Sequence, residues 1–427
     1  MGKLSELREL KKVCLQQMFP QEGEDMPRLR FAGFTGVWEQ RKLGDLIESQ
    51  IIVEQSDGNH GELYPRSDEF QEQGVPYISA SNISSDGNSI DFRSVKYLSP
   101  ERGNKFRKGV AKNGDVLLAH NATVGPSLRL EMPFDYAILS TTLTLFRLDD
   151  AKMDSRLFLS LIRSRGFQSQ LERLMKQTTR NQVPILTQRL IDVMYPLNIT
   201  EQTKIGTFFR TLDNTIAIYK HKLDSLRELK KACLQQMFPQ EGEDMPRLRF
   251  AGFTGAWEQC RLGDVAETFE YGLNAAAADF DGTNKYIRIT DIDDESREFK
   301  ADNVTSPDCD INASDNYKLQ DGDILFARTG ASVGKTYRYL IKDGLVYFAG
   351  FLIRARLKNN FDTDFVYQNT LTKKYSDFIK IMSQRSGQPG VNAQEYAGFP
   401  LDVPCLEEQQ KIGNFFRTID QLIKLYS

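Results

Sequence analysis

The chain has 427 residues, a formal net charge of −3, 40% hydrophobic residues and 11% aromatic residues. This composition is typical of a soluble globular protein with enough apolar side chains for two to four domains. No apolar run approaches the roughly 18–20 residues that a membrane span needs, and the charged start of the chain lacks a signal-peptide core. The five cysteines form no CxxC pair, which predicts a reduced, cytoplasmic protein without structural zinc.

Near its beginning the chain carries a segment that it repeats after 219 residues. Residues 7–45 return as residues 226–264 with only four differences. Two copies at this spacing are too few and too long for a solenoid, so they predict two similar halves, each with its own core. The differing pairs are Val13/Ala232, Val37/Ala256, Arg41/Cys260 and Lys42/Arg261.

The middle of the chain, residues 201–238, predicts one long helix. Its apolar residues recur at alternating spacings of four and three, which is the heptad seam of helices packed along one another. One helix of roughly 35 residues would be about 50 Å long. The seam residues are Ile205, Phe209, Leu212, Ile216, Tyr219, Leu223, Leu226, Cys233 and Met237, with Lys230 as the one polar interruption.

The two chain ends carry the same seam in two pieces. The C-terminal piece supplies Ile412, Phe416, Ile419, Ile423 and Tyr426, and the N-terminal piece supplies Leu4, Leu7, Cys14 and Met18. We therefore expect two long antiparallel helices, one continuous and one assembled from both ends, in a closed pseudo-two-fold arrangement. Independent surface helices at the two ends are the alternative.

The remaining blocks predict a mixed α/β fold with the same order of elements in both halves. The predicted domains are residues 1–19 (half of the assembled helix), 20–200 (first globular domain), 201–238 (central helix), 239–404 (second globular domain) and 405–427 (the other half of the assembled helix). Strands are expected at 75–83, 114–119 and 137–146 and at 285–292, 322–327 and 346–355, and helices at 155–176 and 364–383.

The small net charge hides basic segments. Residues 156–189 carry seven bases and one acid, and residues 328–385 carry eleven bases and four acids. A local cationic face is what a polyanion meets, although a solvated helix surface gives the same pattern. The candidate DNA-contacting cations are Arg163, Arg165, Arg173, Lys176 and Arg180 in the first half and Lys373, Lys374, Lys380 and Arg385 in the second. Asn181, Gln182 and Gln388 are candidate readers of base edges, or members of ordinary polar loops.

One loop resembles a phosphate-binding loop without meeting its requirements. Residues 330–336 (GASVGKT) have three residues between the glycines where a P-loop has four, and TYRYLI after them predicts a strand instead of a helix. We expect a glycine-rich hairpin turn, or a loop that approaches DNA with Arg328, Thr329, Ser332 and Lys335 at its tip. Three scattered histidines give no metal or catalytic spacing, and His120 is expected in a turn.

The sequences PRLRFAGFTGVWEQRKLGD, GDILFARTGASVGKT and FPLDVPCLEEQQKIGNFFRTID together resemble the specificity subunit of Type I restriction-modification systems. The resemblance covers essentially the whole chain. It implies two target-recognition domains, held apart by two antiparallel helices, that each read one half of a split, asymmetric sequence in double-stranded DNA. It further implies two adenine-methylating modification subunits and, in the full complex, restriction subunits as partners.

The resemblance implies no catalysis by this chain, and S-adenosylmethionine, ATP and magnesium would be bound by the partner subunits. Family members commonly begin at a sequence like residues 27–31, whereas this chain begins with half a helix, a circularly shifted layout. A second hypothesis is a scaffold that joins protein partners without reading DNA sequence.

Overall fold

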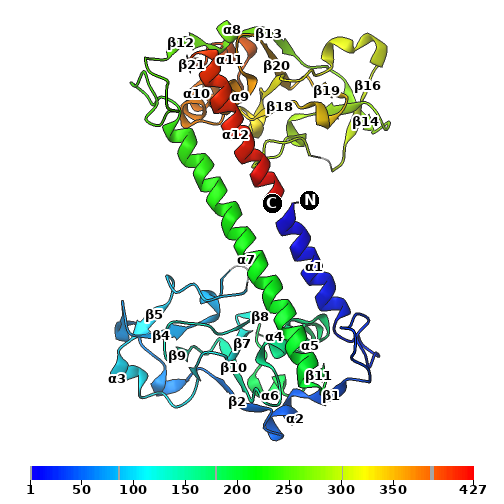
Figure 1. The fold of residues 1–427 in the computed structure, drawn as a ribbon, viewed down its shortest axis with the longest axis vertical. Coiled ribbons are helices and arrows are strands. Elements are labelled where there is room, and N and C mark those ends of the chain that lie inside the picture. Colours follow the sequence, from blue (N-terminus) through cyan, green and yellow to red (C-terminus); the bar gives the residue numbers. More distant parts are fainter. Residues whose placement is uncertain (1, 85–86, 178–179, 301, 385–388) are drawn as a thin grey trace. The chain divides into compact units, whose positions relative to one another are not determined.

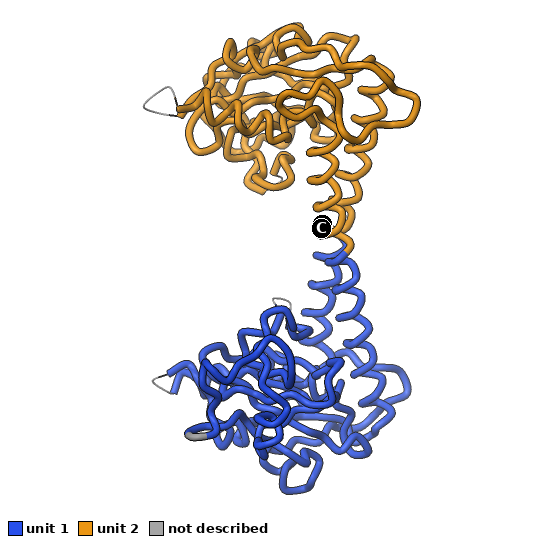
Figure 2. Tube along the Cα trace, turned by 90° about the vertical axis from the view of Figure 1, so that its left-hand side faces the viewer, with its two compact units in different colours: residues 1–221 blue, residues 222–427 orange. Residues whose placement is uncertain are grey.

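The computed structural model describes residues 2–84, 87–177, 180–300, 302–384 and 389–427. The chain forms two compact units, Met1–His221 and Lys222–Ser427, and the boundary falls inside one long helix (Figure 2). Each unit combines small sheets with helices, so the predicted mixed α/β fold with two sheet-rich domains and a long helix is confirmed. No helix among the described residues is long and apolar enough to cross a membrane.

Unit 1 contains a two-stranded sheet β1-β11, a four-stranded sheet β2-β10-β7-β8 and a five-stranded sheet β3-β5-β4-β9-β6. Its helices are α1 (Lys3–Gln17), α2 (Leu43–Glu48), α3 (Pro100–Gly103), α4 (Ser155–Arg163), α5 (Arg165–Lys176), α6 (Ile185–Gln188) and the first part of α7 (Ile199–Gln236). Its strands are β1 (Glu39–Lys42), β2 (Ile52–Asp57), β3 (Phe70–Gln71), β4 (Val75–Ile78), β5 (Lys96–Leu98), β6 (Val110–Ala111), β7 (Val116–Asn121), β8 (Thr123–Arg129), β9 (Ala137–Leu139), β10 (Leu143–Leu148) and β11 (Asp192–Tyr195).

Unit 2 contains a two-stranded sheet β12-β21 and two four-stranded sheets, β13-β20-β17-β18 and β14-β16-β15-β19. Its helices are the rest of α7, α8 (Leu262–Val265), α9 (Thr363–Asn369), α10 (Lys373–Ser383), α11 (Ala393–Ala397) and α12 (Leu406–Tyr426). Its strands are β12 (Glu258–Arg261), β13 (Ala266–Tyr271), β14 (Ala276–Asp279), β15 (Lys285–Ile287), β16 (Thr305–Asp308), β17 (Ile324–Ala327), β18 (Thr336–Arg338), β19 (Val346–Phe348), β20 (Leu352–Leu357) and β21 (Pro400–Val403).

The sheet at the centre of each unit follows one plan. Strand β7 lies between β10 and β8, and β17 lies between β20 and β18, all antiparallel. The strands expected at 114–119 and 322–327 are therefore confirmed. The segments 137–146 and 346–355 were each expected as one strand, but each is two strands that belong to different sheets. A short turn between the two strands of each segment redirects the chain, so that one apolar run serves two sheets.

The helices expected at 155–176 and 364–383 are each interrupted once. In unit 1 the break falls at Ser164, whose backbone is extended (φ −64°, ψ 153°) and whose side chain accepts a hydrogen bond from the Phe167 backbone N–H. In unit 2 Thr372 caps α10 in the same way, by accepting from the Tyr375 N–H. Serine and threonine satisfy the free N–H groups at the start of a helix, which stabilises a new helix at each break.

Helix α7 spans Ile199–Gln236, close to the predicted range 201–238. Within unit 1, α1 lies antiparallel along its first part, and within unit 2, α12 lies antiparallel along its last part (Figure 1). Most of the predicted seam is buried: Leu4, Cys14, Met18, Ile205, Phe209, Leu212, Ile216, Leu223, Cys233, Met237, Ile412, Phe416 and Ile419. Leu7, Tyr219, Leu226, Ile423 and Tyr426 are half-buried.

The polar interruption of the seam has a partner. The Lys230 ammonium lies 2.7 Å from an Asp420 carboxylate oxygen of α12. In unit 1 the repeat-equivalent Lys11 of α1 lies 2.5 Å from Asp213 of α7. Because a charged pair inside an apolar seam is satisfied in one alignment of the helices and not in others, these pairs specify the register.

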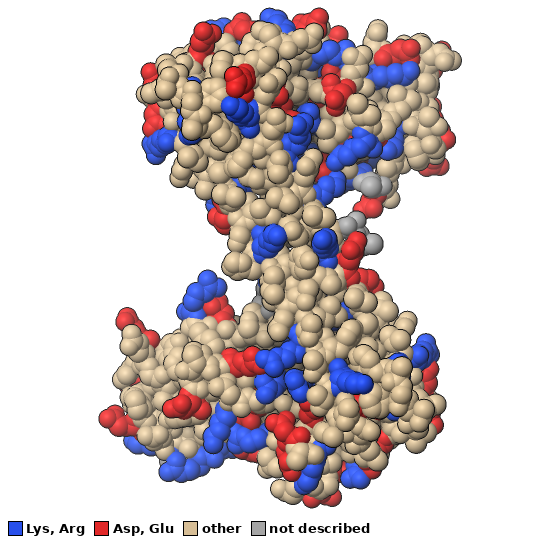
Figure 3. All heavy atoms as spheres, in the orientation of Figure 1, with Lys and Arg blue, Asp and Glu red and all other residues tan. Residues whose placement is uncertain are grey.

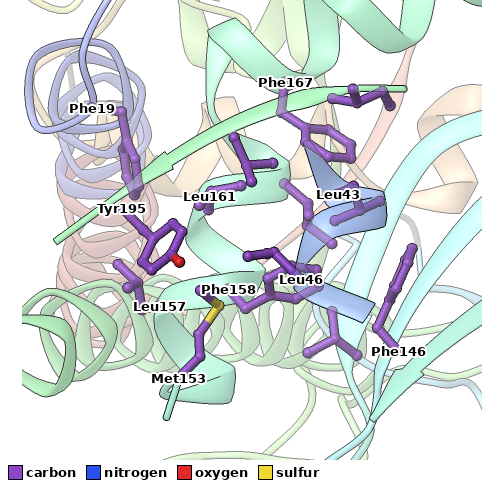
Figure 4. Packing of buried hydrophobic residues seen from close by; sticks show 14 of the residues in the cluster. Phe19, Leu43, Leu46, Phe146, Met153, Leu157, Phe158, Leu161, Phe167 and Tyr195 are labelled. Carbon is purple, nitrogen blue, oxygen red and sulfur yellow. The ribbon is translucent and has the colours of Figure 1, made fainter. Parts of the chain in front are cut away.

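The apolar core of each unit packs against α7. In unit 1 the Phe19 ring packs 5.8 Å from Trp38 and 6.0 Å from Phe209, between ring centroids. Leu157, Phe158 and Leu161 of α4, Leu43 and Leu46 of α2, and Phe146 of β10 continue the same cluster, which is drawn in Figure 4. Unit 2 repeats the arrangement with Phe238, which lies 6.3 Å from Trp257 and 5.9 Å from Phe416.

A buried ion pair joins the repeated segment to the start of the long helix. The Arg30 guanidinium donates two hydrogen bonds to the Glu201 carboxylate, at 2.7 and 2.9 Å, and the Glu201 side chain is 1% exposed. Arg249 and Glu408 form the same pair in unit 2, at 2.6 and 2.7 Å. Removing one partner of such a pair leaves an uncompensated charge out of water.

We therefore expect Arg30→Met to lower the free energy of unfolding of unit 1 by about 3 kcal/mol, because Glu201 would remain buried without its cation. Urea unfolding of the full chain, followed by tryptophan fluorescence, measures this loss. The matched control is Arg28→Met, which breaks an exposed pair with Glu24 and should cost less than about 1 kcal/mol. Equal effects of the two substitutions would contradict a stabilising role for the buried pair.

Candidate nucleic-acid interface

Each unit presents a hairpin tip that is joined to a second loop. In unit 1 the turn between β7 and β8 contains Ala122, whose N–H donates to the Asn181 carbonyl oxygen at 2.9 Å. In unit 2 the turn after β17 contains Gly330, whose N–H donates to the Pro389 carbonyl oxygen at 3.1 Å. In unit 1 the structure thus places the predicted reader Asn181 beside a hairpin tip, and in unit 2 it ties the predicted glycine-rich turn to a second loop.

Several predicted contact residues lie at these tips or on the neighbouring helices with exposed side chains. Exposed members are Arg165, Arg173, Lys176, Arg180, Asn181, Lys373 and Lys380, and half-buried members are Gln182, Arg328, Thr329 and Ser332. Lys176, Lys373 and Lys380 form exposed ion pairs within their own helices, which contribute little stability and can be exchanged for phosphate contacts. Arg385 and Gln388 lie outside the described residues.

Two other predicted cations are engaged inside their units. The Arg163 guanidinium lies 2.8 Å from Asp213 and donates to the Gly87 carbonyl oxygen at 2.7 Å. Lys374 pairs with Asp402 of β21. These ammonium and guanidinium groups hold elements of the fold together, so we do not retain these residues as candidate DNA contacts.

Lys335 does not lie at the loop tip, and that expectation was wrong. Its side chain is 8% exposed, pairs with Asp294 at 2.5 Å and donates to the Ile292 carbonyl oxygen at 3.2 Å. Its own carbonyl oxygen accepts from the Ala327 N–H at 2.8 Å, because the chain has already turned back alongside β17. From Thr336 the chain continues as β18, where a P-loop would open a helix.

A cationic cleft lies between α1 and the α4–α5 junction of unit 1. It has a volume of about 630 Å³, and its lining includes Arg8, Lys11, Lys12, Arg163 and Arg165. Lys11 and Arg163 share Asp213, whereas Arg8, Lys12 and Arg165 are exposed. We call these three the cleft cations. Arg8 and Lys12 were not among the predicted contacts, because residues 1–19 were interpreted only through their apolar seam. The charged face of LRELKK was the signal that could have indicated them.

Lys and Arg side chains lie at several places on both units. On the face drawn in Figure 3, one group of them lies together in unit 1, with acidic side chains beside it, and others lie apart from it. A small net charge of −3 therefore does not exclude a local basic surface.

His120 lies near the end of β7 and not in a turn, which corrects the prediction. Its ring is 5% exposed, and its Nδ1 lies 2.9 Å from the Thr144 hydroxyl oxygen. Burial lowers the pKa of His120 to about 4 from its ordinary value of 6.5. No cluster of three or more potential metal ligands occurs in the part of the chain that the structure describes.

The two α/β units share one long helix, and each unit has a tethered hairpin tip with basic helices beside it. The sequence pattern of the Type I restriction modification DNA specificity domain matches residues 36–228 and 255–426. The chain therefore belongs to this family, the specificity component of Type I restriction-modification systems, which is not itself catalytic.

Two known proteins illustrate the family. The chain is 25% identical over 236 residues to the specificity subunit of the Type I restriction enzyme MjaVIII of Methanocaldococcus jannaschii, covering 53% of this chain. The match spans about half of that relative, 52% of its length. The fold is similar to the crystal structure of a Type-I restriction-modification system S subunit from M. genitalium, with a TM-score of 0.61, 14% identity and 93% of each chain covered.

The buried histidine predicts an acid-sensitive fold. Between about pH 6.5 and pH 4 the unfolded chain binds a proton at His120 that the folded protein does not bind. Acidification over this range therefore favours the unfolded state. The folded state should lose up to about 3 kcal/mol from this group on going from pH 7 to pH 4. Unfolding experiments at several pH values should show this loss for the unchanged protein and a smaller one for His120→Gln. Parallel profiles for the two proteins would contradict the prediction.

Proposed function

We propose that this chain is the DNA-specificity subunit of a Type I restriction-modification complex. Each globular block reads one half of a bipartite, asymmetric site in double-stranded DNA. The long helices set the spacer between the half-sites and dock two modification subunits. The observation that carries this proposal is one backbone frame built twice, with unlike side chains at its hairpin tips.

The tips support the reading of two different half-sites. At equivalent places unit 1 has the sequence HNATVGPS and unit 2 has RTGASVGKT. Base edges are distinguished by the hydrogen-bonding groups that a protein presents to them, so unlike side chains on a common frame select unlike sequences.

The helices support a fixed spacer. Helix α7 begins in unit 1 and ends in unit 2, and 38 residues at 1.5 Å each correspond to about 57 Å. A rigid element between two readers determines the separation of half-sites, as dimer geometry does in other DNA-binding proteins. We infer that α1 and α12 together form the second rod, because each packs on α7 through repeat-equivalent contacts.

The repeated segment supports docking of two copies of one partner. Met26 and Leu29 are both 45% exposed, and their repeat equivalents Met245 and Leu248 are 44% and 45% exposed. Exposed apolar side chains mark interaction surfaces when they are grouped, and a surface presented twice suits two identical modification subunits. S-adenosylmethionine, ATP and magnesium would then belong to the modification and restriction subunits.

An exchange of one block tests the modular part of the proposal. Replacing residues 46–200 with the corresponding block of a relative should change one half of the methylated sequence and leave the other half and the spacer intact. Sequencing of methylated host DNA gives the result directly. Exchange of residues 265–404 is the matched control and should change the opposite half. A change in both halves after one exchange would overturn independent reading.

The cleft cations are expected to contact phosphates. Arg165→Ala should weaken binding to target and random duplexes alike and reduce the slope of log K against log salt by about 1. Arg93→Ala is the matched control, because it removes another exposed arginine of unit 1, one that is paired with Asp91. Competition between target and random duplexes at several salt concentrations measures both effects. A complex of the unchanged chain that shows no preference for any duplex would favour the scaffold hypothesis.

A further inference from the structure

One position of the common frame carries very different residues in the two units. The His120 N–H donates to the Thr142 carbonyl oxygen at 3.0 Å, and the Arg328 N–H donates to the Phe351 carbonyl oxygen at 3.0 Å. His120 lies near the end of β7, Arg328 directly follows β17, and both residues precede the hairpin tip. His120 and Arg328 are therefore structural equivalents, and the similar sequences that precede them, GDVLLA and GDILFA, agree with this.

A further pair of contacts extends this equivalence. The carbonyl oxygens of His120 and Arg328 accept from the Val183 and Val391 N–H groups, at 2.8 and 2.9 Å. Both residues are thus tied on two sides to the same two neighbouring segments. Because the backbone is held in the same way in both units, the side chain is what differs between them at this position.

The two side chains have opposite environments. The His120 ring is buried against Thr144, whereas the Arg328 guanidinium stacks over the Tyr271 ring, 4.8 Å from its centroid. Among the described residues no carboxylate lies within ion-pair distance of the Arg328 guanidinium. Its charge is thus oriented by an aromatic ring and has no carboxylate partner in the described part of the unit.

Arg328 borders a cleft of about 590 Å³ whose lining includes Tyr271, Arg288, Thr290 and Phe351. The Tyr271 and Phe351 side chains are 44% and 60% exposed, which is unusual for two aromatic residues beside one cavity. The Arg288 guanidinium is held by Asp291, at 2.8 and 3.0 Å. The cleft therefore offers one available guanidinium and two partly exposed aromatic rings.

The backbone around this cleft is closely packed. A Cβ atom on Gly272 would lie 2.1 Å from the Ala349 carbonyl oxygen, so only glycine permits this approach. The Tyr271 hydroxyl oxygen accepts a hydrogen bond from the Ala393 N–H at 3.2 Å. The Tyr271 ring is thereby held in place before any ligand arrives, which reduces the entropy lost on binding.

We propose that this cleft is the base-reading site of unit 2, and that Arg328 recognises a guanine in the half-site that this unit contacts. The planar guanidinium donates two N–H groups to the O6 and N7 acceptors of guanine, a match that Arg makes in the major groove. The exposed rings of Tyr271 and Phe351 form the apolar wall beside it. This inference rests on the proposed function and assigns a base to one of its two readers. Unit 1, with a buried histidine at the same position, reads its half-site with other groups.

The test uses the complex purified through the full chain and duplexes that carry each base pair at each half-site position. Arg328→Ala should reduce discrimination at one G·C pair of one half-site by about 10- to 100-fold and leave the other half-site unchanged. Arg328→Gln should shift the preference at that pair from guanine toward adenine, since Gln matches the N6 and N7 groups of adenine. A merely structural or phosphate-binding arginine would not produce this shift.

Lys358→Ala is the matched control, because it removes an exposed cation of unit 2 outside the cleft and should leave every base preference intact. Unchanged thermal unfolding of the Arg328 variants shows that they fold. If both variants keep all base preferences, or lose affinity equally for every duplex, the inference is overturned while the proposed function stands. If the unchanged complex has no preferred sequence, both are overturned.

Discussion

Both cores depend on the apolar seam of α7. Each unit folds its sheets and short helices against its own part of this helix and completes the packing with a second helix, α1 in unit 1 and α12 in unit 2. Burial of the seam supplies the hydrophobic stabilisation, and the pairs Lys11–Asp213 and Lys230–Asp420 select one register for each helix pair. Within each unit, a defined register of the helix pair holds the sheets that pack on it in a defined orientation.

The molecule separates structural charges from charges that can bind a ligand. Arg30, Arg163, Arg249 and Lys374 are engaged with carboxylates and carbonyl groups inside the units. Arg165 and Arg328 lie at cavities, and the second is oriented by an aromatic ring. Counts of basic residues along the chain cannot make this distinction, because it depends on which carboxylate the fold brings within hydrogen-bonding distance.

Particular elements show how far sequence reasoning reached. The long helix and the central strands β7 and β17 were predicted because their periodicity is strong and local. The breaks at Ser164 and Thr372 were missed because both residues also occur on helix surfaces, and only the capping hydrogen bond distinguishes a new start. The interior position of Lys335 was missed because a lysine beside glycines in a polar loop resembles a tip. The cleft cations and the exposed Phe351 could not be predicted, because residues distant in the chain form their surroundings.

The sequence by itself determined the duplication, the seam and the class of protein, because internal identity and the periodic spacing of apolar residues are properties of the order of residues. The tertiary structure alone decided which polar side chains are buried and which are exposed beside a cavity. His120 and Arg328 occupy one place in two copies of a frame, yet one ring is buried and the other side chain lies over an aromatic face. The physical reason is that burial and pairing are properties of the neighbours in space, and residues such as Tyr271 and Arg328 are brought together only when β13 pairs with β20 and β20 with β17.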